Sequence, residues 1–233
     1  MRLRRLGVER GPVTRLVVTG TPLTAEEATE LEWAASELAD DRAVRAVVVA
    51  AAGADFCPGP APDLDRLAID PAAAIAALRC PVVAELKGRV ASVGLELALA
   101  ADIRVAAPGT TFAMPDVAAG RVPAWGGTQR LPRVVGRPIA LAMLLFGSEL
   151  GTDSPLVHEV ADDAGEIIER LLALAPLALE YAKEAVWRGS ELPLRHALEL
   201  EGDLNHLLQA ASSDRAEGLA AFAEKRTPTF EGR

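Results

Sequence analysis

Two carboxylates stand in an otherwise apolar stretch, "GLELALAADIRVAAPGTTFAMPD" at residues 94–116. Only four residues of this stretch are charged, and Glu96 and Asp116 lie at or near its two ends. An isolated ionised carboxylate is costly to bury, so acids in such surroundings are usually paired, solvated in a cleft or functional. Where two carboxylates flank one water molecule, one can accept its proton while the other donates a proton. The stretch therefore raises the question of whether these two acids work together.

The elements that would position these acids alternate between strands and helices. We predict strands at 14–20, 44–53, 80–88 and 101–109, with helices at 24–41 and 94–100. β-Branched strands that alternate with helices are typical of α/β folds with a largely parallel sheet. From about residue 137 onward the pattern is helical. We therefore predict an α/β core over 1–136 and a helical C-terminal region over 137–233.

The composition excludes several classes of protein. The chain has 233 residues, is 50% hydrophobic and carries a net charge of −9, which disfavours nucleic acid or an anionic membrane as the main partner. Its two cysteines are too few for a disulfide framework, and its three histidines share no metal-ligand spacing. The N-terminus lacks the apolar run of a signal peptide. We expect a soluble cytoplasmic protein with no metal site and no membrane span.

Three motifs resemble the crotonase superfamily, which contains the enoyl-CoA hydratases and isomerases. They are "KGRVASVGLELALAADIRVAA", "FAMPDVAAGRVPAWGGTQRLPRVVG" and "SSDRAEGLAAFAEKRTPTF", which together extend over nearly the whole chain in order. The resemblance implies a spiral of ββα units followed by a helical trimerisation region, giving a homotrimer or a dimer of trimers. It also implies an acyl-CoA thioester as ligand, with coenzyme A as the carrier part of the substrate and no prosthetic group.

The resemblance places Glu96 and Asp116 at the two acid positions of the hydratases. Asp116 departs from the family because hydratases usually carry glutamate there, and a side chain shorter by one methylene retracts the carboxylate by about 1 Å. Two alternatives remain open from the residues themselves. Glu96 could face solvent on its helix, and Asp116 could cap a loop after Pro115.

The family's oxyanion hole has two further departures in this chain. The resemblance places one backbone N–H donor at Val93, at the N-terminal end of the 94–100 helix. Relatives prefer glycine at this position. The second donor position falls in "FCPGPAPDL" on Pro60, which has no N–H to donate. Either Ala61 takes over in a rearranged loop, or the hole keeps one donor.

The remaining candidates concern the ligand. The resemblance implies that Lys225 and Phe222 contact the coenzyme A nucleotide and adds Leu64 to the coenzyme A contacts. It places Trp125, Pro60, Gly94 and Ala124 around the acyl group, beneath a segment after Leu64 that is shorter than usual. Trp125 could restrict the pocket to short acyl groups, stack on an aromatic acyl group, or pack under the loop.

We therefore predict an enoyl-CoA hydratase-like enzyme, a lyase. It would add water to an α,β-unsaturated acyl-CoA through a thioester enolate held in an oxyanion hole. One alternative is an isomerase, decarboxylase or hydrolase of acyl-CoA that uses Glu96 alone. Another is a non-catalytic acyl-CoA-binding paralogue. Pro60, Asp116 and the trimmed loops favour this last possibility more than would the residues of an ordinary relative.

Overall fold

The computed structural model describes residues 3–232, apart from the side chain of residue 211. The chain divides into two compact units. The first extends to Leu78 and resumes over Val82–Ala164, and the second comprises Arg79–Pro81 together with the chain from Gly165 onward. Each unit is described separately below.

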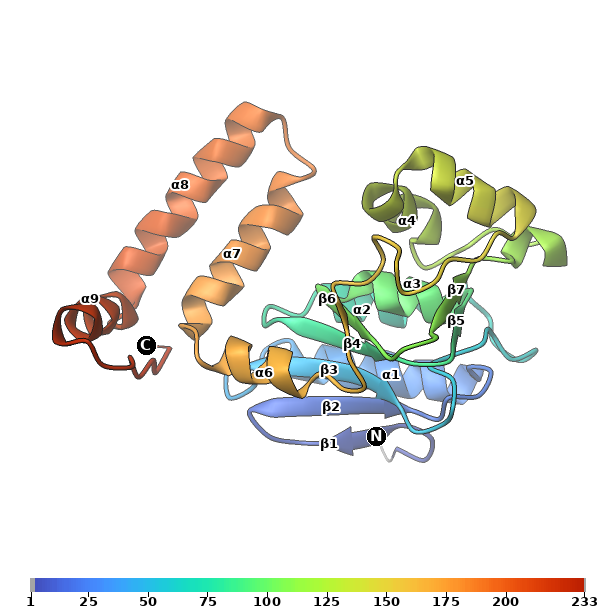
Figure 1. The fold of residues 1–233 in the computed structure, drawn as a ribbon, viewed down its shortest axis with the longest axis horizontal. Coiled ribbons are helices and arrows are strands. Elements are labelled where there is room, and N and C mark those ends of the chain that lie inside the picture. The colour runs from blue at the N-terminus through green and yellow to red at the C-terminus, as the bar shows by residue number, and fades with distance from the viewer. Residues whose placement is uncertain (1–2, 233) are drawn as a thin grey trace. The chain divides into compact units, whose positions relative to one another are not determined.

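A six-stranded sheet forms the centre of the first unit (Figure 1). Its strands, in spatial order, are β1 (Gly7–Glu9), β2 (Val13–Val18), β3 (Ala46–Ala51), β4 (Val82–Leu86), β6 (Ile103–Ala106) and β8 (Glu159–Val160). Every neighbouring pair is parallel except β1 with β2, which confirms the predicted parallel pairing. A second, two-stranded parallel sheet joins β5 (Arg89–Ala91) to β7 (Thr111–Ala113).

The burial of these elements follows from their sequences. All six residues of β3, "AVVVAA", are buried, as expected for a parallel strand that is covered on both faces. Helix α1 (Ala25–Leu38) buries one apolar face that includes Leu31 and Leu38. Its N-cap, Thr24, accepts a hydrogen bond from the Glu27 N–H, whereas the Glu27 carboxylate binds Thr19. Helix α2 (Pro71–Ala76) begins after the capping side chain of Asp70.

Helix α3 (Val93–Ala100) is buried along its whole length. Because none of its eight residues faces solvent, Glu96 is enclosed by protein whichever way its side chain points. The helix begins in close contact with the loop that contains Cys57. A Cβ added at Gly94 would lie 2.4 Å from the Cys57 carbonyl oxygen, so this approach requires glycine.

Three elements complete the first unit beyond β7. They are the 3₁₀ helix η1 (Asp116–Ala119), α4 (Gly127–Val135) and α5 (Arg137–Phe146). Helix α4 packs on α3, and α5 contacts both α4 and η1. Because α5 and β8 belong to the first unit, the division between the units falls at Ala164, whereas the sequence pattern places it at residue 136.

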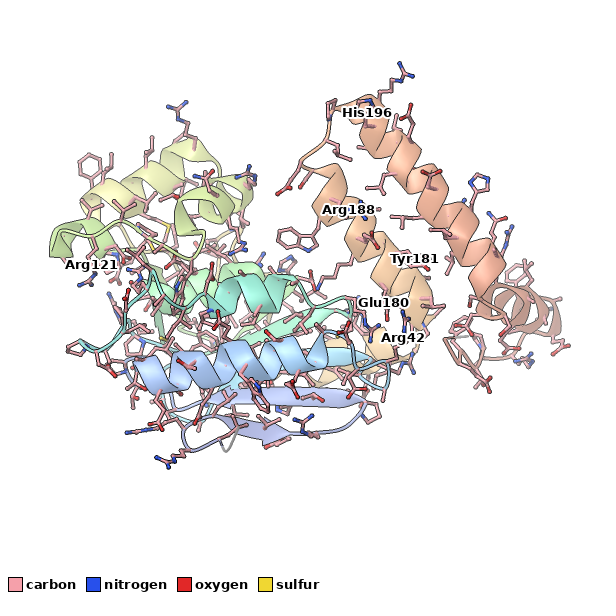
Figure 2. The ribbon with its side chains drawn as sticks, turned by 180° about the vertical axis from the view of Figure 1, so that it is seen from behind. Arg42, Arg121, Glu180, Tyr181, Arg188 and His196 are labelled. Carbon is pink, nitrogen blue, oxygen red and sulfur yellow. The ribbon has the colours of Figure 1, made fainter. Side chains whose placement is uncertain are left out.

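The second unit is helical (Figure 1). It contains α6 (Gly165–Leu172), α7 (Pro176–Gly189), α8 (Leu194–Ala211) and α9 (Asp214–Glu224), and α7 packs side by side with α8. Figure 2 marks Glu180, Tyr181 and Arg188 along α7 and His196 near the start of α8. The Glu180 carboxylate pairs with the guanidinium of Arg79. Arg79 belongs to the short segment Arg79–Pro81 of the second unit, so this ion pair links α7 to that segment.

Candidate active site

Glu96 is fully buried on α3, with 0% of its surface exposed. Its Oε1 atom accepts the backbone N–H groups of Trp125 and Gly127 at 2.7 and 2.9 Å. Its Oε2 atom accepts a guanidinium N–H of Arg66 at 2.6 Å. The structure therefore excludes the alternative in which Glu96 faces solvent, and it gives both carboxylate oxygens hydrogen-bond donors.

The pKa of Glu96 lies above its ordinary value because burial penalises the charged form. The N–H of Gly127, the charge of Arg66 and the N–H of Trp125 act in the opposite direction and offset part of this effect. The raised pKa makes the carboxyl group a stronger base than an exposed one. Such a group is suited to proton transfer.

Asp116 is also buried, with 1% of its surface exposed, at the first position of η1. Its Oδ1 atom accepts the hydroxyl of Ser92 at 2.8 Å and a guanidinium N–H of Arg66. Neither partner of Oδ1 belongs to η1 or to the loop after Pro115, so these contacts do not support the alternative of a simple loop cap. Its Oδ2 atom has no hydrogen-bond partner among the residues that the structure describes.

Arg66 joins the two acids, and the sequence patterns did not predict this role. Its guanidinium donates one hydrogen bond to Glu96 and one to Asp116, from a loop between β3 and α2. The sequence contained one signal: Arg66 is the sole basic residue from Phe56 to Leu78. That signal does not reveal its partners, because these lie 30 and 50 residues away in the chain.

The turn that leads into α3 holds a strained residue. Ser92 adopts φ 52° and ψ −120°, a backbone conformation that residues other than glycine rarely adopt. Its N–H donates to Ala113, its carbonyl accepts from Glu96, and its hydroxyl binds Asp116. These three hydrogen bonds stabilise the turn and link the start of α3 to the carboxylate of η1.

The candidate oxyanion donors differ in their availability. Val93 is the first residue of α3, so its N–H has no acceptor within the helix and lies at the positive end of the helix dipole. The N–H of Ala61 donates to the Leu23 carbonyl at 2.8 Å, beside a bridge between Leu23 and Pro60. Ala61 could replace Pro60 as a donor only if that hydrogen bond broke.

Trp125 is buried beneath the loop that carries Arg66. Its indole N–H donates to the Arg66 carbonyl at 3.1 Å, and its own carbonyl accepts a guanidinium N–H of Arg130 at 2.8 Å. Of the three roles open from the sequence, packing under the loop is the one that these contacts support. Its neighbour Ala124 is half-buried, and Gly94 is packed against Cys57.

The candidate coenzyme A contacts lie in different parts of the chain. Leu64 is half-buried in the Arg66 loop, where its N–H donates to Ala61. Phe222 and Lys225 belong to the second unit, at the end of α9. Phe222 is 85% exposed, and Lys225 has a left-handed backbone with φ 55°. No group of three or more metal-ligating side chains occurs among the residues that the structure describes.

The sequence from residue 20 to residue 233 matches the enoyl-CoA hydratase/isomerase family. The chain belongs to this family. The predicted resemblance to the crotonase superfamily is thereby confirmed. The carboxylates and the turn described above thus lie within the matched region of an enoyl-CoA hydratase/isomerase family member.

Individual family members agree with this assignment. The chain is 36% identical over 173 residues to human enoyl-CoA hydratase domain-containing protein 2, mitochondrial, covering 68% of this chain and 59% of that protein. It is 37% identical to 2,3-dehydroadipyl-CoA hydratase from Escherichia coli K12, covering 69% and 67% of the two chains. The aligned regions therefore span about three fifths to two thirds of these relatives.

Solved structures confirm the fold. An enoyl-CoA hydratase from Bacillus anthracis superposes with a TM-score of 0.87 at 27% identity, covering 99% of this chain and 100% of that one. A family member from Streptomyces coelicolor A3(2) superposes with a TM-score of 0.92 at 32% identity, covering 100% and 96%. The predicted α/β fold with C-terminal helices is confirmed. Within residues 3–232, none of the helices has the length and apolar character of a membrane span.

Proposed function

We propose that this protein adds water to an α,β-unsaturated acyl-CoA. The observation that carries the proposal is the convergence of two buried carboxylates, from α3 and η1, on one guanidinium. Membership of the enoyl-CoA hydratase/isomerase family supports an acyl-CoA ligand. Relatives named 2,3-dehydroadipyl-CoA hydratase and carnitinyl-CoA dehydratase support water addition or removal as the reaction.

Hydration of a conjugated thioester needs a base for the water, an acid for the α-carbon and a donor for the enolate oxygen. Glu96 and Asp116 can supply the first two functions, since both are carboxylates held in fixed positions. Burial raises the pKa of Glu96 and brings it closer to the range in which a carboxyl group both accepts and donates protons. The pair thus has the chemistry that the reaction requires.

The enolate oxygen would be stabilised at the N-terminal end of α3. The Val93 N–H and the helix dipole both favour negative charge there. With Ala61 bound to Leu23, Val93 is the donor that remains of the two candidates. Loss of one oxyanion donor typically costs a factor of about 100 to 1,000 in turnover, so we expect a slow enzyme.

Coenzyme A serves in this proposal as the carrier part of the substrate, and no prosthetic group is needed. Lys225 is our candidate for a phosphate contact and Phe222 for the adenine, with Leu64 nearer the pantetheine. A cationic side chain is a suitable phosphate anchor on a chain with a net charge of −9. We place the protein in the cytoplasm, although the human relative is named as mitochondrial.

A non-catalytic acyl-CoA-binding protein is the second candidate. The observation that favours it is the weakened oxyanion hole, because Pro60 has no N–H and Ala61 donates to Leu23. Such a protein would bind the thioester without converting it. An isomerase or decarboxylase that uses Glu96 alone would convert the thioester without adding water, and a hydrolase would place the water in a released acid.

A substrate screen separates these candidates. Crotonyl-CoA, longer enoyl-CoAs and enoyl-CoAs with a second carboxylate are each incubated with the protein. Hydration removes the absorbance of the conjugated thioester and adds the mass of one water molecule, and the Glu96→Gln variant serves as the inactive control. Thioester binding by calorimetry without any conversion would contradict the hydratase and favour the binding protein. Conversion without a gain in mass would favour an isomerase.

A further inference from the structure

Arg66 has an unusual environment for a loop residue. Its side chain is 7% exposed, whereas its neighbour Leu67 is 92% exposed and Asp65 also faces solvent. The loop therefore lies on the surface and sends one cationic side chain inward. An arginine cannot give up its charge under ordinary conditions, so this position is held by its ion pairs with Glu96 and Asp116.

The four oxygens of the two carboxylates are not equivalent. Both oxygens of Glu96 and the Oδ1 atom of Asp116 accept hydrogen bonds. The Oδ2 atom of Asp116 and the Nε–H of Arg66 are buried, and neither has a partner within the described part of the chain. A buried acceptor and a buried donor left without partners commonly mark a place for water or a ligand.

The charges at this site also depend on Arg66. Two carboxylates that share a buried site repel each other, and without a cation one of them takes up a proton. Arg66 supplies a positive charge in direct contact with both. Arg130 of α4 is the other cation that acts on Glu96, and it also interacts with Asp70. It is partly buried, and its guanidinium donates to the carbonyl of Trp125.

We infer that Arg66 is a positioning residue of the site: its guanidinium offsets the repulsion between the Glu96 and Asp116 carboxylates and, by binding Asp116 Oδ1, leaves Asp116 Oδ2 as the oxygen that exchanges the proton. The inference rests on the proposed hydratase function. Glu96 and Asp116 together hold the water molecule. Its oxygen bonds to the β-carbon, its proton passes to Asp116 Oδ2, and the π electrons move to the thioester oxygen. The enolate then takes that proton from Asp116 at its α-carbon. Atoms balance, because the product is the substrate plus one water molecule.

Arg66 is itself held by the element that orients Glu96. The Trp125 indole N–H binds the Arg66 carbonyl, while the Trp125 backbone N–H binds Glu96. One residue thus fixes both the loop backbone and one member of the acid pair. The indole supplies the contact with the loop, whereas the contact with Glu96 comes from the backbone.

The test compares Arg66→Met and Arg66→Lys with wild type in hydration of crotonyl-CoA. Arg121→Met is the matched control, because Arg121 follows η1 but its side chain is exposed at the outside of the first unit (Figure 2). We expect Arg66→Met to lower kcat about tenfold or more with little change in KM, as for a group that acts on proton transfer. On the acid side of its pH–rate profile, the pH of half-maximal rate should move upward by about 1 unit or more, since one carboxyl group then holds its proton more tightly.

Arg66→Lys keeps the charge, so the acid side of its pH–rate profile should stay near that of wild type while kcat recovers in part. This variant also covers the case in which Arg66→Met fails to fold, because removal of one partner from a buried ion pair is strongly destabilising. Turnover of Arg66→Met equal to or faster than that of wild type would overturn the inference. A shift of the acid side of the pH–rate profile to higher pH in Arg66→Lys would also overturn the inference.

A second measurement does not depend on turnover. In protein with carbon-13-labelled aspartate and glutamate side chains, carboxyl resonances followed from pH 8 to pH 4 report the protonation of Glu96 and Asp116. We expect the first proton to bind at higher pH in Arg66→Met than in wild type and in Arg66→Lys. An inactive wild type that shows this difference would sink the hydratase but retain the electrostatic role of Arg66. An active wild type without the difference would sink the role of Arg66 alone.

Discussion

The charged groups of the first unit and those of the C-terminal helices are built in opposite ways. In the first unit, the carboxylates of Glu96 and Asp116 are buried, and each accepts hydrogen bonds from two or three different residues. On α8 and near α9, the pairs Arg195–Glu199 and Arg226–Glu217 lie at the surface. The two buried carboxylates thus have the fixed positions that our proposed acid–base role requires. The exposed pairs on the C-terminal helices contribute little to stability and favour solubility.

The apolar side chains of the two units also differ. The first unit buries most of its apolar residues around the sheet, although Leu145 and Phe146 of α5 are exposed, and α7, α8 and α9 bury few of theirs and leave several large ones exposed. Among these, Leu194 is 75% and Phe222 is 85% exposed, and the others include Val186, Leu198 and Leu219. Such exposure on a folded chain is typical of surfaces that contact another chain. The helical unit therefore supports our proposal of a homotrimer or a dimer of trimers.

The largest effect that the comparison predicts is on turnover at the buried pair. Asp116→Asn removes the acceptor capacity of Oδ2 and one negative charge beside Arg66, so we expect a loss of about 100- to 10,000-fold in kcat. Glu96→Gln should lower kcat by a comparable factor, because residues that act as one unit have non-additive effects, so the loss of either disables the pair. Steady-state kinetics check both, with calorimetry to show that coenzyme A binding persists. A kinetically silent Asp116→Asn would leave Glu96 as the sole acid–base group.

The second prediction concerns association through the helical unit. We expect light scattering at micromolar concentration to give the mass of three or six chains. Leu194→Glu with Leu198→Glu places two charges on one face of α8 and should shift the mass toward that of one chain. Arg195→Ala on the same helix is the control and should leave the mass unchanged. A monomeric wild type would contradict the proposed assembly.

A third prediction uses a buried carboxylate away from the site. Burial alone would raise the pKa of Glu30, but the N–H groups of Leu6, Arg5 and Arg4 outweigh it and hold the pKa below 4.5. The stabilisation from this ionised group is complete above the unfolded-state pKa. It is lost as pH falls through the lower folded-state pKa. Glu30→Gln should therefore lower the free energy of unfolding by about 1–3 kcal/mol at pH 7.

Denaturant unfolding at several pH values checks this prediction. The difference between wild type and Glu30→Gln should shrink below pH 4.5, where the unfolded chain begins to bind a proton at Glu30 while the folded chain keeps the charge to lower pH. Glu32→Gln on the same helix is a suitable control. A difference between wild type and Glu30→Gln that stays constant down to acid pH would show that the charge of Glu30 contributes nothing.

The smallest predicted effect belongs to a surface pair. Arg195 and Glu199 lie at a helical spacing of four residues on α8, with side chains 86% and 57% exposed. Arg195→Ala should change the free energy of unfolding by less than about 0.5 kcal/mol, and less still in high salt. A larger loss in thermal unfolding would show that surface charges on the helical unit matter more than the comparison implies.

The sequence predicted those features that depend on local patterns and on family motifs. The strand at 44–53 appears as Ala46–Ala51, and the helix at 94–100 appears as Val93–Ala100, because each is a strongly apolar run with clear limits. Glu96 and Asp116 were placed together by the family motifs, and the structure brings both to one guanidinium.

The features that the sequence did not predict depend on tertiary contacts. Arg66 lies in a loop without periodicity, and its partners are distant in the chain, so neither its burial nor its pairing has a local signature. The compact units divide at Ala164 and the sequence pattern divides at residue 136, because β8 has two residues, too few to show a strand pattern. The hydrogen bond from Ala61 to Leu23 depends on an isolated bridge that no motif encodes.

The central claim is that the buried pair adds solvent water across an enoyl-CoA. Incubation of the protein with crotonyl-CoA in water enriched in heavy oxygen, followed by mass spectrometry of the product, tests it directly. We predict one solvent oxygen in the acyl part of the product, formed at a rate that falls in parallel in Glu96→Gln and Asp116→Asn. Heavy oxygen found in a released acid, or equal incorporation by the two variants and wild type, would contradict the claim.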